Sequence, residues 1–281
     1  MKMKYLKQNS LTGACAYVCA RVGSTKSWAG GALPGRASLK MRPAAAPPRP
    51  SSQLYVLIAC EESQAECLAF RNLGHIAFSC DLQRARYNPD WHIQSDVTPL
   101  LEGQKKFITQ SGCTVEVPRW DLIISHPPCT YLCRLSACQM KVHGIMNWNR
   151  YRQMILGRRF FLKCLDAPAE YVAVENPVPM RRANIPRPSF YADPSWFGVK
   201  YTKKTCYWVK ELPPIMPTIL YSRPKCYVTS SRGKYRSRTF PQMAEEIAKQ
   251  WSEFILERRA TTTPTTAAAC LSRHLLQTPG G

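Results

Sequence analysis

One cysteine of this sequence stands where a nucleophile is useful. Cys129 follows Pro127 and Pro128, which come directly after the apolar residues 122–124. A short apolar run is typical of a buried parallel strand, and proline cannot donate to a sheet ladder, so the strand must end before the prolines. Cys129 is therefore held on a stiff turn just beyond the carboxyl end of a strand. Ligands of open α/β sheets bind at that end, which makes Cys129 a candidate nucleophile.

A second polar constellation follows the next strong strand signal. Glu175, Asn176 and Pro177 come directly after the apolar residues 171–174. Further strands are expected at 54–60, 76–80 and 205–209, with helices beginning at a Ser63 cap, at Pro99, at about 149 and at 240. Strands that alternate with helices indicate βαβ units. The sequence therefore predicts an α/β fold with a mostly parallel sheet and helices on both faces.

The two ends of the chain differ in composition from its middle. Residues 1–52 contain nine Lys and Arg and no acidic residue, and residues 258–281 contain three and none. We expect a disordered basic leader at 1–52, one catalytic domain at 53–257 and a disordered tail at 258–281. The leader also resembles an organelle transit peptide in composition, and an extended reading frame is a further alternative.

The net charge of +21 suggests a polyanionic partner. Within the domain, residues 53–128 carry six basic and nine acidic residues, whereas residues 129–257 carry 21 basic and nine acidic ones. This asymmetry suggests that a polyanion meets one side of the domain only. A solubilising surface is the alternative interpretation of the same charge.

Several classes of protein do not fit the sequence. There is no apolar run long enough for a transmembrane helix and no secretory signal, so we expect no membrane contact. The 13 cysteines include no Cys-x-x-Cys pair, so no metal site is expected, and free thiols suit a reducing cytoplasm. We expect a monomer without an obligatory protein partner.

Pro128-Cys129 followed by Glu175-Asn176, at consecutive strand ends, resembles the two catalytic motifs of the cytosine-5 DNA methyltransferases. The short phage and prophage members are the most similar, over roughly residues 54–257 and including Ala59-Cys60-Glu61. The resemblance implies a Rossmann-like fold that binds S-adenosylmethionine, action on a base-flipped cytosine in DNA, and a phage or bacterial host.

The chemistry of that family requires these residue types. Carbon 5 of cytosine is too weak a nucleophile to accept a methyl group unaided. A thiolate that adds at carbon 6 makes the ring enamine-like, and a carboxyl group at ring nitrogen 3 stabilises the charge that develops. The resemblance implies that Cys129 is the nucleophile, that Glu175 contacts nitrogen 3 and that Asn176 holds the Cys129 loop.

The resemblance also implies a cofactor site across the first strand ends. Asp81 follows the second strand and is expected at the ribose hydroxyls, with Asp96 at the adenine amino group. The other implied contacts are Ala59, Cys60, Glu61, Ser125 and Pro127. The first loop departs from the family, because it has no glycine and Gln64 stands where phage-type members keep one. A missing glycine restricts close approach of the backbone to the cofactor.

Basic residues of the second half are expected to contact phosphates. The candidates are Lys203, Lys204, Arg236 and Arg238. Only a short stretch separates Val209 from Lys234, where the family normally carries a target-recognition domain. Sequence specificity is therefore expected to be low, short or supplied by the loop 129–149.

Two alternatives stay open. Ser125-His126-Pro127-Pro128 is similar to the Asp/Asn-Pro-Pro-aromatic motif of amino-methylating DNA enzymes, but His126 replaces the acid or amide and Cys129 the aromatic residue. The second alternative is a catalytically decayed nucleic-acid-binding protein of the same fold, which Gln64 favours. RNA also stays open as the substrate.

Overall fold

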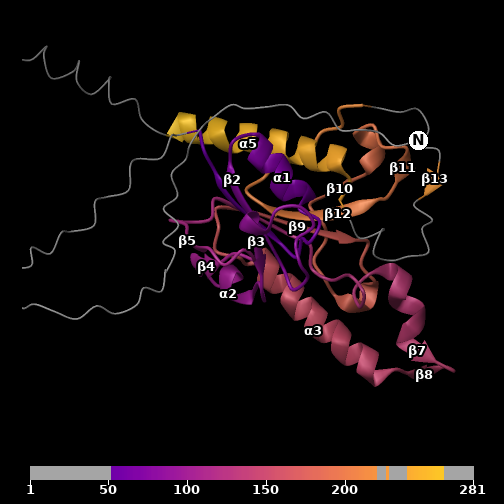
Figure 1. Ribbon diagram of the computed structural model, residues 1–281. Coiled ribbons are helices and arrows are strands. Elements are labelled where there is room, and N and C mark those ends of the chain that lie inside the picture. Colours follow the sequence, from indigo (N-terminus) through magenta and orange to yellow (C-terminus); the bar gives the residue numbers. More distant parts are fainter. Residues whose placement is uncertain (1–51, 220–225, 228–238, 263–281) are drawn as a thin grey trace, which may run out of the picture. The chain divides into compact units, whose positions relative to one another are not determined.

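A seven-stranded sheet lies at the centre of the computed structural model, which describes residues 52–219, 226–227 and 239–262 (Figure 1). These residues all belong to the unit Pro47–Gly281. The leader up to residue 51, the tail from residue 263, and the predicted phosphate contacts Arg236 and Arg238 lie outside the described residues.

Five neighbouring strands of the sheet are parallel, in the order β3-β2-β1-β6-β9. They comprise β1 (Tyr55–Ala59), β2 (Ile76–Asp81), β3 (His92–Gln94), β6 (Leu122–Ser125) and β9 (Tyr171–Pro177). The chain builds outward from β1 to β3 and then returns to β6 on the other side of β1. Such a reversal of strand order is where open α/β sheets bind ligands.

Two further strands complete the sheet with the opposite pairing. The strand β12 (Thr205–Lys210) runs antiparallel to β9, and β10 (Phe190–Ala192) runs antiparallel to β12. The prediction of an α/β fold with a mostly parallel sheet is therefore confirmed, and the arrangement is compatible with a Rossmann-like fold.

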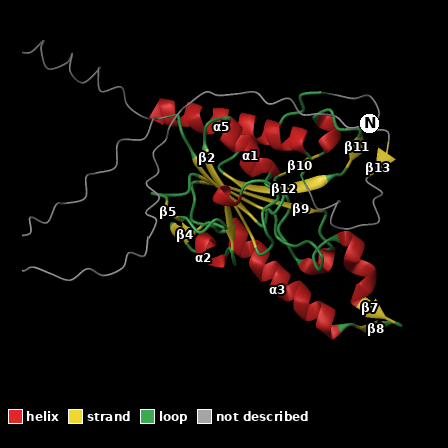
Figure 2. Ribbon diagram, in the orientation of Figure 1, coloured by secondary structure: helices red, strands yellow, loops and turns green. Residues whose placement is uncertain are grey.

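Helices cover both faces of the sheet, as expected (Figure 2). One face packs against α1 (Ala65–Asn72) and α5 (Pro241–Thr262), with Phe70 and Trp251 fully buried. The other face packs against α3 (Trp148–Leu165) and α2 (Thr98–Leu101). Each fully buried large side chain contributes roughly 1.5–3 kcal/mol, so both layers stabilise the strands that carry the site.

Several short elements were not predicted. They are the sheet strands β3 and β10, the antiparallel hairpins β4 (Lys106–Ile108) with β5 (Thr114–Glu116) and β7 (Lys141–Val142) with β8 (Ile145–Met146), the parallel pair β11 (Tyr201–Thr202) with β13 (Cys226–Tyr227), and the 3-10 helices η1 (Pro89–Trp91), η2 (Arg134–Met140), η3 (Arg181–Ala183) and η4 (Pro194–Trp196). Pieces of two or three residues are too short to give a hydrophobic period.

Two local predictions were wrong. Ser63 does not cap α1, because Gln64 is the N-cap residue and its own side chain makes no capping bond. Glu175 and Asn176 do not follow a strand, because they lie within β9. The parallel pairing of β9 with β6 stops at Val174, but its antiparallel pairing with β12 continues to Pro177. The two residues nevertheless extend beyond the carboxyl end of β6.

A buried carboxylate fixes the far end of the sheet from the site. Asp121, which is fully buried, accepts a hydrogen bond of 2.7 Å from the backbone N–H of Tyr55. Its other oxygen lies 2.6 Å from both the Arg119 and the Arg259 guanidinium groups. Arg259 belongs to α5, which extends past the boundary expected at residue 257. The last helix is therefore tied to the start of β1 and β6 by charge as well as by packing.

Candidate active site

The loop that carries Cys129 is fixed on both sides of the thiol. At its start, the backbone N–H of His126 donates to the carbonyl of Ala59 at 2.9 Å. Past the thiol, the N–H groups of Leu132 and Cys133 both donate to the carbonyl of Cys129 at 3.0 Å. The sulfur is half-buried at the top of this closed turn, so a ligand can reach it while the backbone stays in place.

The end of β9 holds the same loop from a second side. The buried Asn176 side chain donates through Nδ2 to the carbonyl of Pro127 at 2.8 Å. The segment after β9 adds two backbone bonds of 2.8 Å, from the N–H of Arg134 to the carbonyl of Val178 and from the N–H of Met180 to the carbonyl of Leu132. Cys129 and Glu175 therefore lie on two segments that are bonded to each other.

Glu175 is the end of a chain of three side chains. Its Oε2 lies 3.2 Å from Nδ1 of His126, and Nε2 of the same ring lies 3.0 Å from Oε2 of Glu66. Glu66 comes from α1 and is fully buried, whereas His126 and Glu175 are only slightly exposed. The hydroxyl of Thr205 on β12 donates to the remaining oxygen of Glu175. One cluster of side chains around Glu175 therefore joins four elements, namely the loop after β6, the strands β9 and β12, and the helix α1.

The charges of this chain are set by its members. Burial alone would raise the pKa of Glu175, but the His126 hydrogen bond and the Lys203 charge outweigh it and lower the pKa to about 2. Burial would lower the pKa of His126, but the two flanking carboxylates raise it well above its ordinary value. At neutral pH, His126 is therefore an imidazolium ion between two carboxylates.

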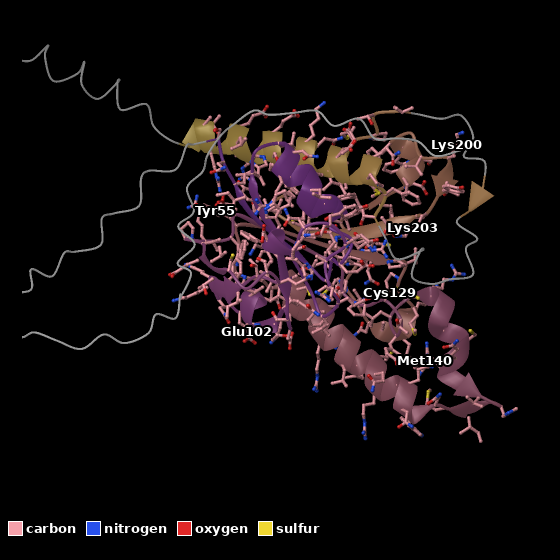
Figure 3. All side chains as sticks on the ribbon, viewed as in Figure 1. Tyr55, Glu102, Cys129, Met140, Lys200 and Lys203 are labelled. Carbon is pink, nitrogen blue, oxygen red and sulfur yellow. The ribbon has the colours of Figure 1, made fainter. Side chains whose placement is uncertain are left out.

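Cys129 is held as a thiol in this structure. Its hydrogen bond with Cys133, burial and the nearby Glu175 charge raise its pKa far above the ordinary value for cysteine, while the Lys203 charge acts in the opposite direction. Figure 3 labels Cys129 and Lys203, which lie at the same edge of the sheet. Because the thiolate is the nucleophilic form, this site needs a change in its surroundings before it can react.

The loop between β1 and α1 adopts the backbone shape of a glycine loop without any glycine. Cys60 and Gln64 both have a positive φ, at 62° and 57°. Gln64 is fully buried and makes three hydrogen bonds, accepting from the N–H groups of Tyr87 and Asn88 and donating to the Asn88 carbonyl. The loop thus has the left-handed conformation that glycine favours without containing a glycine, and the hydrogen bonds of the Gln64 side chain secure it.

Glu61 takes over the capping role that was expected of Ser63. Its carboxylate accepts hydrogen bonds from the backbone N–H groups of Glu66 at 2.8 Å and Cys67 at 3.3 Å, while the Ser63 hydroxyl only donates to Glu61. Burial and the Glu66 charge raise the pKa of Glu61 to about 7. Glu61 thus lies in the loop before α1 and caps the N–H groups of the first turn of that helix.

The residues expected at the cofactor lie at adjacent strand ends. Ala59 is the last residue of β1 and is followed by Cys60 and Glu61, while Ser125 is the last residue of the neighbouring β6 and Pro127 lies in the loop after it. Asp81 is half-buried at the end of β2, and Asp96 is exposed in the loop after β3.

This set fits S-adenosylmethionine by its donor chemistry. Asp81 and Asp96 each accept one backbone N–H from two residues further on, which orients their carboxylates at the strand ends. Carboxylates accept hydrogen bonds from ribose hydroxyls and amino groups. Together with Glu66 and Glu175, they outnumber the two cations of the site, His126 and Lys203, and this excess of negative charge suits a sulfonium cation.

The basic residues divide into two groups. Lys203 is half-buried, and its charge acts on both Cys129 and Glu175, so it belongs to the site rather than to an outer surface. Lys204 is exposed, and its ammonium group lies 4.1 Å from the centre of the Tyr191 ring. The predicted contacts Arg236 and Arg238 cannot be placed, since they lie outside the described residues.

The segment after Cys129 is basic and partly apolar at its surface. From Leu122 to Leu165 the sequence contains seven Lys and Arg and no acidic residue. The hairpin β7–β8 and the start of α3 expose Ile145 and Trp148 at 72% and 70%. Arg150 bonds the carbonyl of Thr130 and lies over the Tyr131 ring, which links the start of α3 to the Cys129 loop. This surface is the one that adjoins the candidate nucleophile.

Two members of the site were missed by the sequence analysis. His126 was considered only as a departure from an amino-methylating motif, and Glu66 was not singled out. No sequence signal marked Glu66, because its burial within α1 is seen only in the folded chain, where a charge needs a partner. The pairing itself joins positions 60 and 49 residues apart, which no local pattern reveals.

A cavity of about 700 Å³ lies between β3 and the β4–β5 hairpin and is bordered by Gln94 and Ser95, which precede Asp96 in the chain.

Within the described part of the chain, no group of three or more His, Cys, Asp or Glu side chains has an arrangement that could hold a metal ion, and no helix is long and apolar enough to cross a membrane.

Comparison with known proteins does not assign the chain to a family. No family model matches it, and a search of the curated proteins finds no similar sequence. The findings therefore identify an α/β fold with a polar cluster at the carboxyl edge of its sheet, and the function has to be argued from that cluster.

Proposed function

We propose that this protein is a DNA (cytosine-5-)-methyltransferase that uses S-adenosylmethionine. The observation that carries the proposal is the bonding of the Cys129 loop to the end of β9, which puts a thiol and a carboxylate on two joined segments. A thiol for carbon 6 and a carboxylate for nitrogen 3 are the groups that covalent activation of cytosine requires. The strand reversal at β1 and β6 supports a ligand site beside them.

In the proposed mechanism, Cys129 attacks carbon 6 of an extruded cytosine. The sulfur–carbon bond forms, the ring electrons shift toward nitrogen 3, and carbon 5 becomes nucleophilic. Asn176 keeps the loop in place through Pro127, and Glu175 faces nitrogen 3. After carbon 5 is methylated, its proton is lost to solvent and the sulfur leaves carbon 6 as a thiolate, which restores the aromatic ring. The thiolate then takes up a proton from solvent, which restores the thiol. One positioned acid–base contact of this kind contributes roughly 10²–10⁴ in rate.

The raised pKa of Cys129 is consistent with a nucleophile that is inactive until substrate is present. Lys203 is the cation whose charge favours the thiolate, and the Cys133 hydrogen bond is the main feature that opposes it. A base that enters the site must separate Cys129 from Cys133 or strengthen the effect of Lys203. The proton of the thiol then leaves to solvent as the sulfur–carbon bond forms.

S-adenosylmethionine, when bound, supplies the electrophilic methyl group. Asp81 and Asp96 would hold its ribose and adenine groups, and the ends of β1 and β6 would line its path toward Cys129. The positive φ of Cys60 and Gln64 supports this placement, because the loop already follows the course that a glycine would allow. The residues of the chain would therefore bind and orient the cofactor, and they would exclude water from the reacting carbon.

DNA is proposed to meet the domain at the acid-free segment that adjoins Cys129. Lys and Arg side chains suit phosphate contacts, and an exposed aromatic side chain offers a stacking surface for bases. Trp148 and Ile145 stand at the tip of this segment, and Lys204 extends the basic surface from β12. Such a surface would support the duplex while one nucleotide is extruded, at a cost of a few kcal/mol.

The test is covalent trapping on DNA that contains 5-fluorocytosine, with S-adenosylmethionine present. Fluorine cannot leave carbon 5 as a cation, so the thiol mechanism stalls as a denaturation-resistant complex. The native protein is expected to form the complex, and Cys129→Ser is expected to bind the same DNA without forming it. Methylation of an exocyclic amine with no trapped complex would instead support the amino-methylating alternative, and no transfer at all would support a binding protein.

A further inference from the structure

The chain Glu66–His126–Glu175 is more elaborate than a single contact to a base requires. A carboxylate at nitrogen 3 can be positioned by one hydrogen bond, such as the one from Thr205. Here Nδ1 of His126 lies 3.2 Å from Glu175, and Nε2 of the same ring lies 3.0 Å from the fully buried carboxylate of Glu66. Burial of Glu66 costs free energy unless a cation compensates its charge, since an unpaired buried carboxylate is strongly disfavoured.

Glu66 has few other interactions to justify its burial. One of its oxygens, Oε2, contacts His126, and the other, Oε1, is buried without a hydrogen-bond partner among the residues that the structure describes. Glu66 also faces Glu61, whose pKa it helps to raise. The imidazolium of His126 is thus the cation that compensates Glu66, and Glu66 in turn fixes the Nε2 proton on its own side of the ring.

We propose that His126 is a positioning residue that stores the proton for Glu175 and delivers it through that carboxyl group to nitrogen 3 of the target base. This inference rests on the proposed methyltransferase function. Glu66 holds Nε2–H, so the proton on Nδ1 is the one that faces Glu175 and can move.

The proton balance of the proposed step closes within these side chains. As the sulfur of Cys129 bonds to carbon 6 and the ring electrons move to nitrogen 3, the Nδ1 proton passes to Glu175 and from Glu175 to nitrogen 3. His126 is left neutral, with Nε2–H donated to Glu66. When the sulfur leaves carbon 6, the proton returns from nitrogen 3 through Glu175 to Nδ1. Neither an oxidant nor a further reactant is needed.

A store behind Glu175 explains how an ionised carboxylate can act as an acid. A pKa of about 2 leaves Glu175 without a proton at neutral pH, whereas the pKa of His126 is raised so that it keeps one. The titratable and charged groups that face this pair are Glu61 and Glu66 from the β1–α1 region, Cys129 and Lys203, and Cys206 and Tyr207 on β12. The proton is available below the pKa of His126 and is lost as the pH rises through it.

The experiment compares the native protein with His126→Asn, Glu66→Gln and Glu62→Gln. The last is a matched control, because Glu62 is a carboxylate in the loop just before α1 and pairs with Arg86 at 2.7 Å instead of with His126. The first measurement is the rate of complex formation on 5-fluorocytosine DNA from about pH 6 to about pH 10. The second is the ¹⁵N NMR titration of the His126 ring in the free protein, which needs neither DNA nor cofactor.

The native rate is expected to fall at alkaline pH where the NMR signal of His126 titrates. Glu66→Gln removes a negative charge, so both the alkaline fall and the NMR titration should move to lower pH, while Glu62→Gln should leave both in place. His126→Asn is expected to slow complex formation roughly 10²-fold and to abolish the alkaline fall. If His126→Asn does not fold, Glu66→Gln, which keeps the size of the side chain, still decides the question.

Two results separate the inference from the proposed function. If the native protein forms no complex on 5-fluorocytosine DNA, the methyltransferase proposal fails and the proton store fails with it. If the native protein forms the complex, but His126→Asn matches its rate or Glu66→Gln leaves the alkaline fall where it was, the proton store alone is overturned.

Discussion

The amide of Asn176 donates to the carbonyl of Pro127 at 2.8 Å, and this bond connects the end of β9 to the loop that carries Cys129. The two strands β6 and β9 are neighbours, but their backbone pairing stops before either residue is reached. The side-chain bond therefore continues the connection between the strands into the site. Because of this bond, the distance between the Cys129 thiol and the Glu175 carboxylate is set by the sheet and not by two loops that move independently.

Asn176→Asp is expected to destabilise the protein and misplace Cys129. An aspartate cannot donate to the Pro127 carbonyl, and it adds a buried charge opposite an acceptor, so the free energy of unfolding should fall by roughly 1–3 kcal/mol. Urea unfolding measures the change. The exposed Asn149→Asp serves as a control for the chemical substitution itself. Equal stability of Asn176→Asp and the native protein would contradict the role given to this bond.

Cys133→Ala should lower the pH at which Cys129 reacts. The hydrogen bond with Cys133 is the largest contribution to the raised pKa of the Cys129 thiol, so its removal leaves the thiolate easier to form. The measurement is the pH dependence of Cys129 alkylation by iodoacetamide, read by peptide mass spectrometry. Cys138→Ala, at an exposed position in the same segment, should leave the pH dependence unchanged. A Cys133→Ala profile identical to the native one would show that Cys133 does not restrain the nucleophile.

Replacements of Gln64 should separate its side-chain bonds from its backbone strain. Gln64→Ala removes the three hydrogen bonds and keeps the positive φ, whereas Gln64→Gly also removes the strain. Unpaired buried N–H groups cost about 1–3 kcal/mol each, and glycine recovers only about 1 kcal/mol. Both variants should therefore unfold at lower urea concentration than the native protein, with Gln64→Ala the less stable. A Gln64→Gly variant more stable than the native protein would mean that the three bonds contribute little.

Glu61 should make the stability of the protein depend on pH. Its pKa is raised from 4.5 to about 7 by burial and the Glu66 charge, so the folded state holds this proton more tightly than the unfolded chain does. The free energy of unfolding should then fall as the pH rises from about 4.5 to about 7, by on the order of 3 kcal/mol. Urea unfolding at several pH values should show this fall in the native protein and in Glu62→Gln, and a smaller one in Glu61→Gln. An equal fall in Glu61→Gln would assign the effect to another group.

Trp148→Ala combined with Ile145→Ser should weaken DNA binding without loss of stability. Both side chains are largely exposed on the acid-free segment, so their removal costs little folding energy, while stacking on a base contributes roughly 1–3 kcal/mol. Fluorescence anisotropy with labelled duplex DNA, at fixed salt, is expected to show at least a tenfold loss of affinity. Met216→Ser is an exposed control outside that segment. Unchanged affinity of the double variant would move the DNA surface elsewhere.

The fold could be predicted from the sequence where apolar runs are long enough to define an element. The runs in β1, β2, β6 and β9 are continuous because both faces of these strands are covered by helices. The hairpins β4–β5 and β7–β8 could not be predicted in this way, since their strands of two or three residues alternate with exposed positions. The length of an apolar run, more than its composition, decided which elements could be predicted from the sequence.

The site could be predicted in part, for a different physical reason. Cys129, Glu175 and Asn176 follow strand signals in the sequence, and parallel strands bring their carboxyl ends to one edge. The histidine bridge could not be predicted, because α1 and β9 approach His126 only in the folded chain. The cap of α1 was assigned to Ser63 on local preference, but a carboxylate from Glu61 offers a stronger, charge-assisted acceptor to the same N–H groups.

The position of α5 has a consequence for how the protein is made. This helix is the last described element, yet it shares one face of the sheet with α1 and brings Arg259 to Asp121. While the ribosome is still translating residues 240–260, the part of that face that α5 covers is bare, and Asp121 lacks one of its two cations. Folding of the domain can therefore finish only after α5 has been synthesised, and chaperones that recognise exposed apolar strands have a window in which to act.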